Sequence, residues 1–555
     1  MSVFDYCRRH SSTVNVGNTP LGGDSPIRVQ SMASTSTLDT DGSVAQAERI
    51  INAGAEYLRF TAQGVREAEN LGNIRAALRA KGLDTPLVAD IHFNPRAAFA
   101  SAKQVEKVRI NPGNFVDPGR TFRSIEYTDE EYAAELERIE QALVPFLDTC
   151  RAHGTAIRIG VNHGSLSDRI MSRYGDTPAG MAESAMEFLR VCNRHGFHNV
   201  VISIKASNVT VMVETVRRMV RAMDAEDMHY PLHLGVTEAG DGEDGRIKSA
   251  VGIGALLAEG IGDTIRVSLS EDPASEIPVA KAIVDYIDMR RNAPSIDGHY
   301  APDYNPVIPA RRNPSLTPAV VGNGADAPYD ADSRPDMFID RNTDRFLIVD
   351  ATEAAENPPA ADPNQIIILT TDHINRSGRM LATLHALTEA GITNRIIPLL
   401  RYDGVDPDTA RLRAAIDSGA ILLAGFTDGI MIQSDALTEA ESARLAFAIL
   451  QSARLRFTRT EYIACPGCGR TLFDLRQTLA QVKAATSHLK NLKIGVMGCI
   501  VNGPGEMADA DYGYVGAGAG RVSLYKGKVC VEKNIPEEEA VSRLIQLIKD
   551  NDDWK

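Results

Sequence analysis

Val200-Val201-Ile202-Ser203-Ile204-Lys205-Ala206-Ser207-Asn208 is an apolar run of strand type that ends in polar residues. Seven further runs of this kind lie in the first 290 residues, and helical patterns such as Asp129–His153 separate them. This alternation predicts βα units and a parallel sheet, and eight units in this length predict a TIM (β/α)8 barrel. The predicted strands are Ile27–Ser31, Glu56–Phe60, Leu87–Ile91, Val105–Ile110, Ala156–Val161, Val200–Lys205, Leu232–Thr237 and Thr264–Ser268.

The carboxyl ends of these strands carry similar side chains, and in a TIM barrel those ends meet at the mouth of the active site. Arginine forks fit phosphate oxygens two at a time, so several cations at one mouth predict a site for a diphosphate or larger polyanion. A single arginine there is more often a surface ion pair, and His92 alone is more often structural, but the recurrence around the barrel favours the anion site. Glu238 is either an acid/base group or a structural partner of a nearby cation. The strand-end residues are Gln30, Ser31, Arg59, Asp90, His92, Arg109, Asn111, Arg158, Asn162, Lys205, Ser207, Asn208, Thr237, Glu238, Arg266 and Ser268.

Three cysteines and a glutamate lie near the C-terminus, in Cys465-Pro466-Gly467-Cys468-Gly469-Arg470 and in the stretch from Met497-Gly498-Cys499 to Glu506. Three soft thiolates with one exchangeable oxygen ligand suit a [4Fe-4S] cluster whose fourth iron can take a substrate oxygen. A structural zinc site is the alternative. The turn Asn502-Gly503-Pro504-Gly505 favours the cluster, because it brings the backbone close to a bulky group and returns Glu506 toward Cys499.

Length and composition limit the class of protein. The chain has 555 residues, of which 43% are hydrophobic and 24% charged, which predicts two to four globular domains and excludes a disordered or membrane protein. Seven cysteines are too few and too irregular for a disulfide scaffold, and no signal-peptide pattern opens the chain, so we expect a cytoplasmic protein. A net charge of −14 argues against nucleic-acid and membrane partners, so a local cationic cluster must attract any anionic substrate.

The middle of the chain resembles a partial copy of the barrel. Residues 291–360 are rich in proline, aspartate and asparagine, which predicts a linker and irregular crossing. A second run of βα units follows and repeats the barrel end at an offset of 165 residues, with chance similarity as the alternative. Thr370 and Met431 stand where the barrel has Lys205 and Arg266, which suggests a scaffold or spacer. The clearest repeated positions are Leu234, Gly254 and Asp263, which recur as Leu399, Gly419 and Asp428.

Three domains are therefore predicted. Residues 1–290 form the TIM barrel that binds the anion, and residues 291–457 form an inserted, partial TIM-like α/β domain. Residues 458–555 form a small α+β domain that carries the cysteines, because short apolar runs alternate there with two helical patterns.

Together the motifs resemble those of the 4-hydroxy-3-methylbut-2-enyl diphosphate synthase family of the methylerythritol phosphate route to isoprenoids. The segment from about 291 to 455 resembles the extra domain of the three-domain form. The motifs are Val29-Gln30-Ser31-Met32, Ala89-Asp90-Ile91-His92, Val108-Arg109-Ile110-Asn111-Pro112-Gly113, Arg158-Ile159-Gly160-Val161-Asn162, Gly235-Val236-Thr237-Glu238-Ala239-Gly240, Ile265-Arg266-Val267-Ser268 and the two cysteine stretches.

The resemblance implies an oxidoreductase that opens and dehydroxylates 2-C-methyl-D-erythritol 2,4-cyclodiphosphate with two electrons from ferredoxin or flavodoxin. It implies that Cys465, Cys468 and Cys499 hold a [4Fe-4S] cluster, with Glu506 on the fourth iron until substrate displaces it. Glu238 would handle protons, Asn502 would contact the substrate, and the strand-end residues would bind the diphosphate. In two-domain relatives the cluster and the barrel mouth come from different subunits of a homodimer. A chain with this insert can instead close on itself, and the sequence leaves both arrangements open.

Two other functions remain open on the residues alone. A hydro-lyase of the aconitase kind also leaves one iron open, but it needs no external reductant. A zinc-stabilised binding module for a phosphorylated metabolite would be colourless and would contain zinc.

Overall fold

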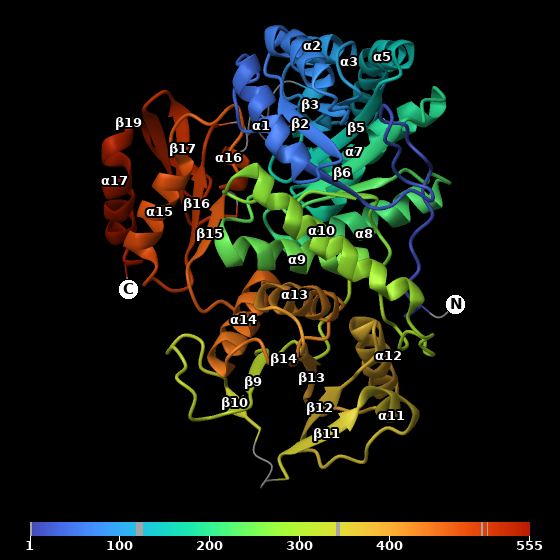
Figure 1. The fold of residues 1–555 in the computed structure, drawn as a ribbon, viewed down its shortest axis with the longest axis vertical. Coiled ribbons are helices and arrows are strands. Elements are labelled where there is room, and N and C mark those ends of the chain that lie inside the picture. Colours follow the sequence, from blue (N-terminus) through green and yellow to red (C-terminus); the bar gives the residue numbers. More distant parts are fainter. Residues whose placement is uncertain (1–2, 118–125, 340–343, 501–502, 508, 555) are drawn as a thin grey trace. The chain divides into compact units, whose positions relative to one another are not determined.

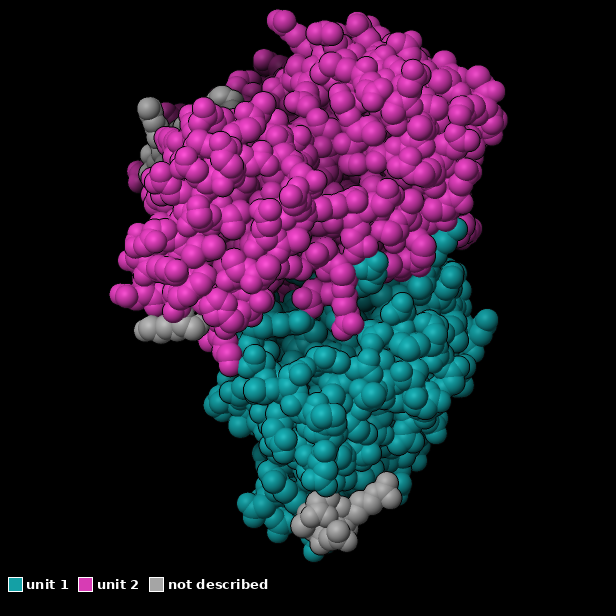
Figure 2. Space-filling view, turned by 60° about the vertical axis from the view of Figure 1, so that its left-hand side comes forward, with its two compact units in different colours: residues 1–9, 246–261, 281–459 teal, residues 10–245, 262–280, 460–555 magenta. Residues whose placement is uncertain are grey.

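The computed structural model (Figure 1) describes residues 3–117, 126–339, 344–500, 503–507 and 509–554, without the side chains of Pro504 and Glu506. The chain forms two compact units, coloured in Figure 2. Residues 10–245, 262–280 and 460–555 make up the barrel unit, and residues 1–9, 246–261 and 281–459 make up the middle unit. Each unit draws on more than one predicted domain, and the three domain ranges remain a prediction. None of the described helices has the length and apolar character needed to cross a bilayer.

Eight parallel strands close a barrel in chain order, which confirms the predicted TIM fold (Figure 1). The last two strands are shorter than predicted, because Gly235–Glu238 and Arg266–Ser268 leave the ladder near the mouth. The strands are β1 Arg28–Met32, β2 Tyr57–Thr61, β3 Leu87–Asp90, β4 Lys107–Ile110, β5 Ala156–Asn162, β6 Val200–Lys205, β7 Leu232–Leu234 and β8 Thr264–Ile265. The helices up to residue 288 are α1 Thr40–Asn52, α2 Val65–Ala80, α3 Pro95–Ala102, α4 Pro112–Phe115, α5 Asp129–His153, α6 Asp168–Tyr174, α7 Pro178–Arg194, α8 Val209–Ala225, α9 Gly242–Ala258 and α10 Glu276–Asp288.

Apolar side chains fill the barrel at the amino ends of its strands. Val14 and Leu21 pair as an isolated bridge and pack there with Val88 and Val201. Because this end is filled and dry, the polar side chains of the strands collect toward the carboxyl ends. The local helix signals agree with the fold: α5 begins with a capping box at Thr128 and ends at Gly154, whose φ is +67°.

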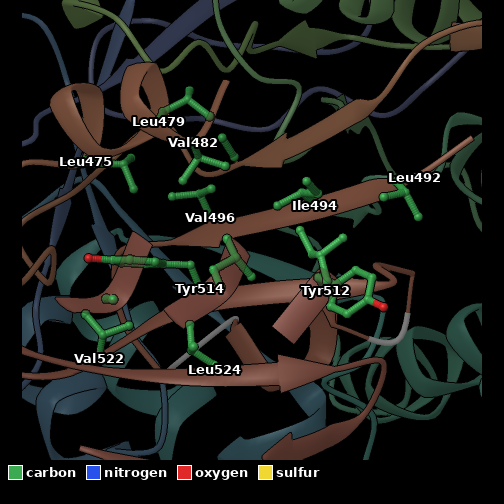
Figure 3. Packing of buried hydrophobic residues seen from close by; sticks show 14 of the residues in the cluster. Leu475, Leu479, Val482, Leu492, Ile494, Val496, Tyr512, Tyr514, Val522 and Leu524 are labelled. Carbon is green, nitrogen blue, oxygen red and sulfur yellow. The ribbon is translucent and has the colours of Figure 1, made fainter. Parts of the chain in front are cut away.

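The last hundred residues form a five-stranded mixed sheet with two longer helices, as predicted for a small α+β domain. Strands β15 to β17 are parallel, and β17 to β19 are antiparallel. Figure 3 shows the core that Val496, Tyr514 and Leu524 of this sheet share with Leu479 of α15. The elements are β15 Glu461–Ala464, α15 Leu475–Thr486, β16 Lys493–Met497, α16 Gly503–Glu506, β17 Tyr512–Gly518, β18 Arg521–Lys526, β19 Val529–Pro536 and α17 Glu537–Asp550.

The middle unit contains a parallel six-stranded sheet in the order β10-β9-β14-β13-β12-β11. The interpretation of residues 291–360 as irregular is wrong in part, because this segment supplies three strands and a helix. The strands are short and stand among proline- and aspartate-rich turns, so their apolar character is diluted in any sequence window. The elements are η2 Met289–Asn292, β9 Ala319–Gly322, β10 Met337–Phe338, β11 Phe346–Asp350, α11 Ala351–Glu356, β12 Ile366–Thr370, α12 Arg376–Glu389, β13 Ile396–Arg401, α13 Pro407–Leu423, β14 Gly429–Gln433 and α14 Glu439–Ser452.

Hydrogen bonds repeat with the sequence at the offset of 165. Asp263 accepts a hydrogen bond from the N–H of Leu232 at 2.8 Å, and Asp428 accepts one from Ile396 at 3.0 Å. Helices α9 and α13 span Gly242–Ala258 and Pro407–Leu423, which differ by 165 residues at both ends. Such agreement in internal bonds and bounds supports a duplicated barrel end over chance.

The repeated glycines also meet within the middle unit. A Cβ added to Gly254 would lie 2.7 Å from the Ile416 side chain, and one added to Gly419 would lie 2.8 Å from the Val251 carbonyl oxygen. Residues 251 and 254 correspond to residues 416 and 419, so the two copies of this helix contact each other through reciprocal positions. Small residues at such a crossing let the two backbones approach closely.

Candidate active site

The barrel mouth and two loops that bear the cysteines line one pocket of about 660 Å³, and all of its lining belongs to the barrel unit of one chain. The cysteine loops are residues 465–472 and 498–500. The barrel contributes Met32, Arg59, Asp90, His92, Arg109, Asn162, Lys205, Thr237, Glu238, Arg266 and Ser268. The cysteine loops and the end of β16 contribute Cys465, Pro466, Gly467, Cys468, Arg470, Thr471, Met497, Gly498 and Cys499.

Parallel pairing of β15 with β16 brings the cysteines to one edge of their sheet. Ala464 pairs with Val496, so Cys465 and Cys499 leave the same edge one and two residues after their strands end. The N–H of Gly498 donates to the Cys465 sulfur at 3.3 Å. Burial above all raises the pKa of the Cys465 thiol, the Gly498 N–H opposes this rise, and nearby Glu238 adds to it.

The cysteine loops are seated on the barrel by backbone contacts. Ser270 donates to the carbonyl oxygen of Cys465 at 2.9 Å, and Ala239 forms a parallel bridge with Ala464. Gly164 and Gly505 approach so closely that a Cβ on Gly164 would lie 2.5 Å from the Gly505 Cα. The chain therefore closes the site with its own cysteine loops.

Arg109 and Asp90 form the centre of the cationic ring. Arg109 donates to Asp90 at 3.2 Å and to Asn162 at 2.7 Å, and it also contacts the His92 ring. Burial would raise the pKa of Asp90, but Arg59 and Arg109 hold it well below its usual value, so Asp90 is a carboxylate. Burial and Arg109 keep the pKa of His92 well below its usual value, so His92 is neutral.

Three cations differ in how they are compensated. Arg266 forms a two-pronged pair with buried Glu276, with distances of 3.1 and 2.9 Å. Arg59 donates only to the thioether of Met32, at 3.0 and 2.6 Å, and within the described residues no carboxylate pairs with it. A thioether is a weak acceptor, so Arg59 keeps its capacity for an anion. Lys205 also has no carboxylate partner in the described parts of the chain, and burial with nearby arginines lowers its pKa well below the usual value.

Arg158 lies beneath the pocket rather than in its lining. Its side chain is fully buried, and none of its three guanidinium nitrogens has a hydrogen-bond partner among the described residues. Lys107 and His233 are buried with it and likewise leave their nitrogens unpartnered within the described chain. Burial of polar atoms without partners is costly, so this layer under the floor is the part of the barrel core most responsive to an anion above it.

The other predicted site residues have structural contacts or lie outside the described part. Asn111 caps α4 and Asn208 caps α8 through their side-chain oxygens, and Ser207 lies 3.5 Å from Asp509. Asn502 is outside the described residues. The backbone of Glu506 ends α16, and its side chain is not described. The structure thus leaves the roles of both predicted residues as predictions.

Two lining residues were absent from the predicted site. Met32 supplies the thioether that receives Arg59. Arg470, next to the cysteine pair in sequence, enters the pocket and reaches Asp90. A charge beside a Cys-x-x-Cys pair was a signal that could have identified it.

The cysteine arrangement can be compared with the two metal centres considered from sequence. In the described residues, no group of three or more His, Cys, Asp or Glu side chains is placed to hold one metal ion. A tetrahedral zinc needs its sulfurs within about 4 Å of one another, whereas an iron–sulfur cube spaces them more widely. Three cysteines that line one pocket without converging on a point fit the cube better than zinc.

Comparison with known proteins matches both halves of the barrel unit. The model described as the GcpE TIM-barrel domain matches residues 11–281, and that of the GcpE protein C-terminal domain matches residues 461–550. Three similar proteins are each named 4-hydroxy-3-methylbut-2-en-1-yl diphosphate synthase (flavodoxin). That of Parabacteroides distasonis is 55% identical and that of Phocaeicola vulgatus 52%, each with 100% of both chains covered. That of Chlorobaculum tepidum is 40% identical over 100% of this chain and 90% of its own.

Proposed function

The chain belongs to the GcpE family of 4-hydroxy-3-methylbut-2-en-1-yl diphosphate synthases, and from this premise we propose that it acts on 2-C-methyl-D-erythritol 2,4-cyclodiphosphate. Two electrons and one proton convert this doubly charged ring to water and the triply charged (E)-4-hydroxy-3-methylbut-2-enyl diphosphate of the methylerythritol phosphate pathway. The observation that carries the proposal is the single pocket that joins a cationic ring to three cysteines.

The pocket-lining cations bind the diphosphate. Arg59 and Lys205 lack carboxylate partners among the described residues, so they have the most capacity to accept phosphate oxygens, while Arg109 and Arg266 are already oriented by Asp90 and Glu276. Charge-assisted bonds from a preformed fork hold the anion in one orientation. His92, Asn162, Thr237 and Ser268 add neutral hydrogen-bonding groups around it. Arg158 adds positive potential from beneath, and Asn111, Ser207 and Asn208 position the loops that follow their strands.

Cys465, Cys468 and Cys499 would hold a [4Fe-4S] cluster, with Glu506 as the exchangeable fourth ligand. When bound, the cluster supplies the electrons singly at low potential and a Lewis-acid iron for the leaving oxygen. The residues present fit this group: the cysteines line one pocket, and a backbone N–H already donates to a cysteine sulfur.

Glu238 provides the proton at the side of the pocket that adjoins Cys465. Its side chain is only 1% exposed, and its backbone has a φ of +50°, which a residue other than glycine rarely adopts. Strain of this kind persists where the surrounding structure fixes a functional side chain. Asn502 contacts the substrate from the neighbouring loop.

A flavodoxin-type donor fits the names of the similar proteins, with ferredoxin as the other candidate. The cytoplasmic location remains a proposal that rests on the sparse cysteines. The homodimer also remains untested, although the pocket is lined by one chain.

Anaerobic purification followed by iron, sulfide and zinc assays and a turnover test would examine the proposal. We expect iron and sulfide, and conversion of the cyclic diphosphate only with a reductant. Cys499→Ser should lose cluster and turnover, while Cys530→Ser, a change on β19 outside the pocket lining, should lose neither. Turnover without a reductant would indicate a hydro-lyase, and zinc in place of iron would indicate the binding module.

A further inference from the structure

Arg470 is the one charged side chain that the described part of the cysteine loops contributes to the pocket. One of its terminal nitrogens lies 3.3 Å from both the carboxylate and the backbone oxygen of Asp90. The other lies 4.0 Å from the sulfur of Cys468. The Arg470 side chain is 8% exposed, so these contacts are made with little competition from water.

Asp90 is an unexpected residue at the mouth of a diphosphate site, because a carboxylate repels a phosphate. Its partners explain it: Arg109 is held from the barrel side and Arg470 from the cysteine side. Asp90 therefore joins two cations that belong to segments 361 residues apart. Burial opposes the charge of Arg470, but Asp90 and then the sulfurs of Cys468 and Cys499 raise its pKa, so the guanidinium stays charged.

A diphosphate and a cluster with three thiolates and a carboxylate are both anions, and they must come into contact for the reaction. Repulsion between them grows as water leaves the pocket, because the dielectric falls. A guanidinium that touches the cysteine loop on one side and the ring carboxylate on the other reduces that repulsion. Hydrogen bonds to cluster sulfurs also raise the reduction potential of such centres.

We propose that Arg470 is a positioning residue that bridges Asp90 to the Cys468 loop, seats that loop on the barrel mouth and places a positive charge between substrate and cluster. This inference rests on the proposed function. Glutamine at this position keeps some hydrogen-bonding capacity without the charge, and lysine keeps the charge without the fork. The two substitutions therefore separate the electrostatic part of the role from the seating part.

The test compares Arg470→Gln, Arg470→Lys and Asp90→Asn with Arg476→Gln, an exposed arginine on α15 of the same small domain. Cluster potential is measured by anaerobic spectroelectrochemistry, KM and kcat with the cyclic diphosphate, and backbone hydrogen exchange in both cluster-free and loaded protein. We expect Arg470→Gln to shift the potential to more negative values and to raise KM about tenfold or more. Arg470→Lys should keep the potential close to that of the parent while KM still rises.

Hydrogen exchange tests the bridge without catalysis. Arg470→Gln should accelerate exchange in residues 87–95, and Asp90→Asn should accelerate it in residues 466–473, with Arg476→Gln unchanged in both. The proposal is overturned if Arg470→Gln matches Arg476→Gln in potential and KM, or if Asp90→Asn leaves residues 466–473 as protected as before. If the parent protein fails to convert the cyclic diphosphate, the proposed function is wrong, and the potential and exchange results still decide the role of Arg470.

Discussion

Arg59 and Arg266 line the same pocket, but replacing each with methionine should have opposite effects on stability. Arg266 is paired with Glu276, and both side chains are almost fully buried. Removing one partner of a buried ion pair leaves the other charge uncompensated, which costs about 3–5 kcal/mol. Glu276 retains its hydrogen bonds from Ser31 and from the Leu269 N–H, so we expect the lower end, about 3 kcal/mol.

Arg59 leaves no such charge behind. Its printed hydrogen bonds go to the Met32 thioether, and Asp90 keeps both Arg109 and Arg470 when Arg59 is removed. Burial lowers the pKa of Arg59 to about 10, which shows that the folded state disfavours this charge. Arg59→Met should therefore be as stable as the parent protein or more stable.

Both variants should bind the substrate more weakly. A two-pronged bond from arginine to a phosphate contributes about 3 kcal/mol, which corresponds to about a 100-fold rise in KM or in the dissociation constant of inorganic pyrophosphate. Urea unfolding followed by circular dichroism measures the first effect, and titration calorimetry with pyrophosphate the second. The double variant Arg266→Met/Glu276→Gln removes the stranded charge, so it should recover stability without recovering binding.

Two results would refute this reasoning. If Arg59→Met is destabilised as much as Arg266→Met, the compensation seen in the structure does not control stability. If the double variant is as unstable as Arg266→Met alone, the loss comes from packing rather than from the stranded carboxylate.

Three further outcomes follow from the fold. Burial, then Arg158, lowers the pKa of His233 well below its usual value, so His233 takes up a proton on unfolding. Its stability contribution is present above about pH 6.5, and the free energy of unfolding should fall below that by up to about 1.4 kcal/mol per pH unit, less steeply in His233→Gln when urea unfolding is repeated at several pH values. Gly419→Ala should lower the free energy of unfolding by about 1–2 kcal/mol, because its Cβ meets backbone, whereas Gly254→Ala meets a side chain that can move; equal midpoints would contradict the packing. Gly164→Ala should reduce kcat/KM at least about tenfold, whereas Gly154→Ala, with a similar positive φ but open space around it, should pay the same backbone strain without loss of activity.

Sequence could predict the barrel because each strand announces itself through an apolar run and a turn. It could also predict which residue types gather at the mouth, since parallel strands share the direction of their carboxyl ends. Depth was harder to predict. Arg158 lies four residues before the end of β5, which places it about 13 Å below the mouth, whereas Lys205 ends β6. Counting residues back from each strand end would have separated these two cations.

Loop contacts between distant segments could not be predicted in this way. Nothing in the local sequence relates Arg470 to Asp90, because their contact depends on how the small sheet docks on the barrel. Asn111 and Asn208 show the opposite case: each directly precedes a helix, so the capping signal was available and competes with a substrate-binding role. A polar residue between strand and helix serves both purposes equally well on sequence grounds.

The pattern of compensation explains how a chain with a net charge of −14 can still concentrate an anion. Arg109 and Arg266 spend their charge on Asp90 and Glu276 and act mainly as fixed forks. Arg59, Lys205 and, below them, Arg158 have no carboxylate partner among the described residues, and burial lowers the pKa of each. An anion in the pocket would supply what these three lack, so its binding should raise their pKa values and stabilise the barrel together. The negative surface then matters little at short range, because a few buried cations outweigh distant, screened charges.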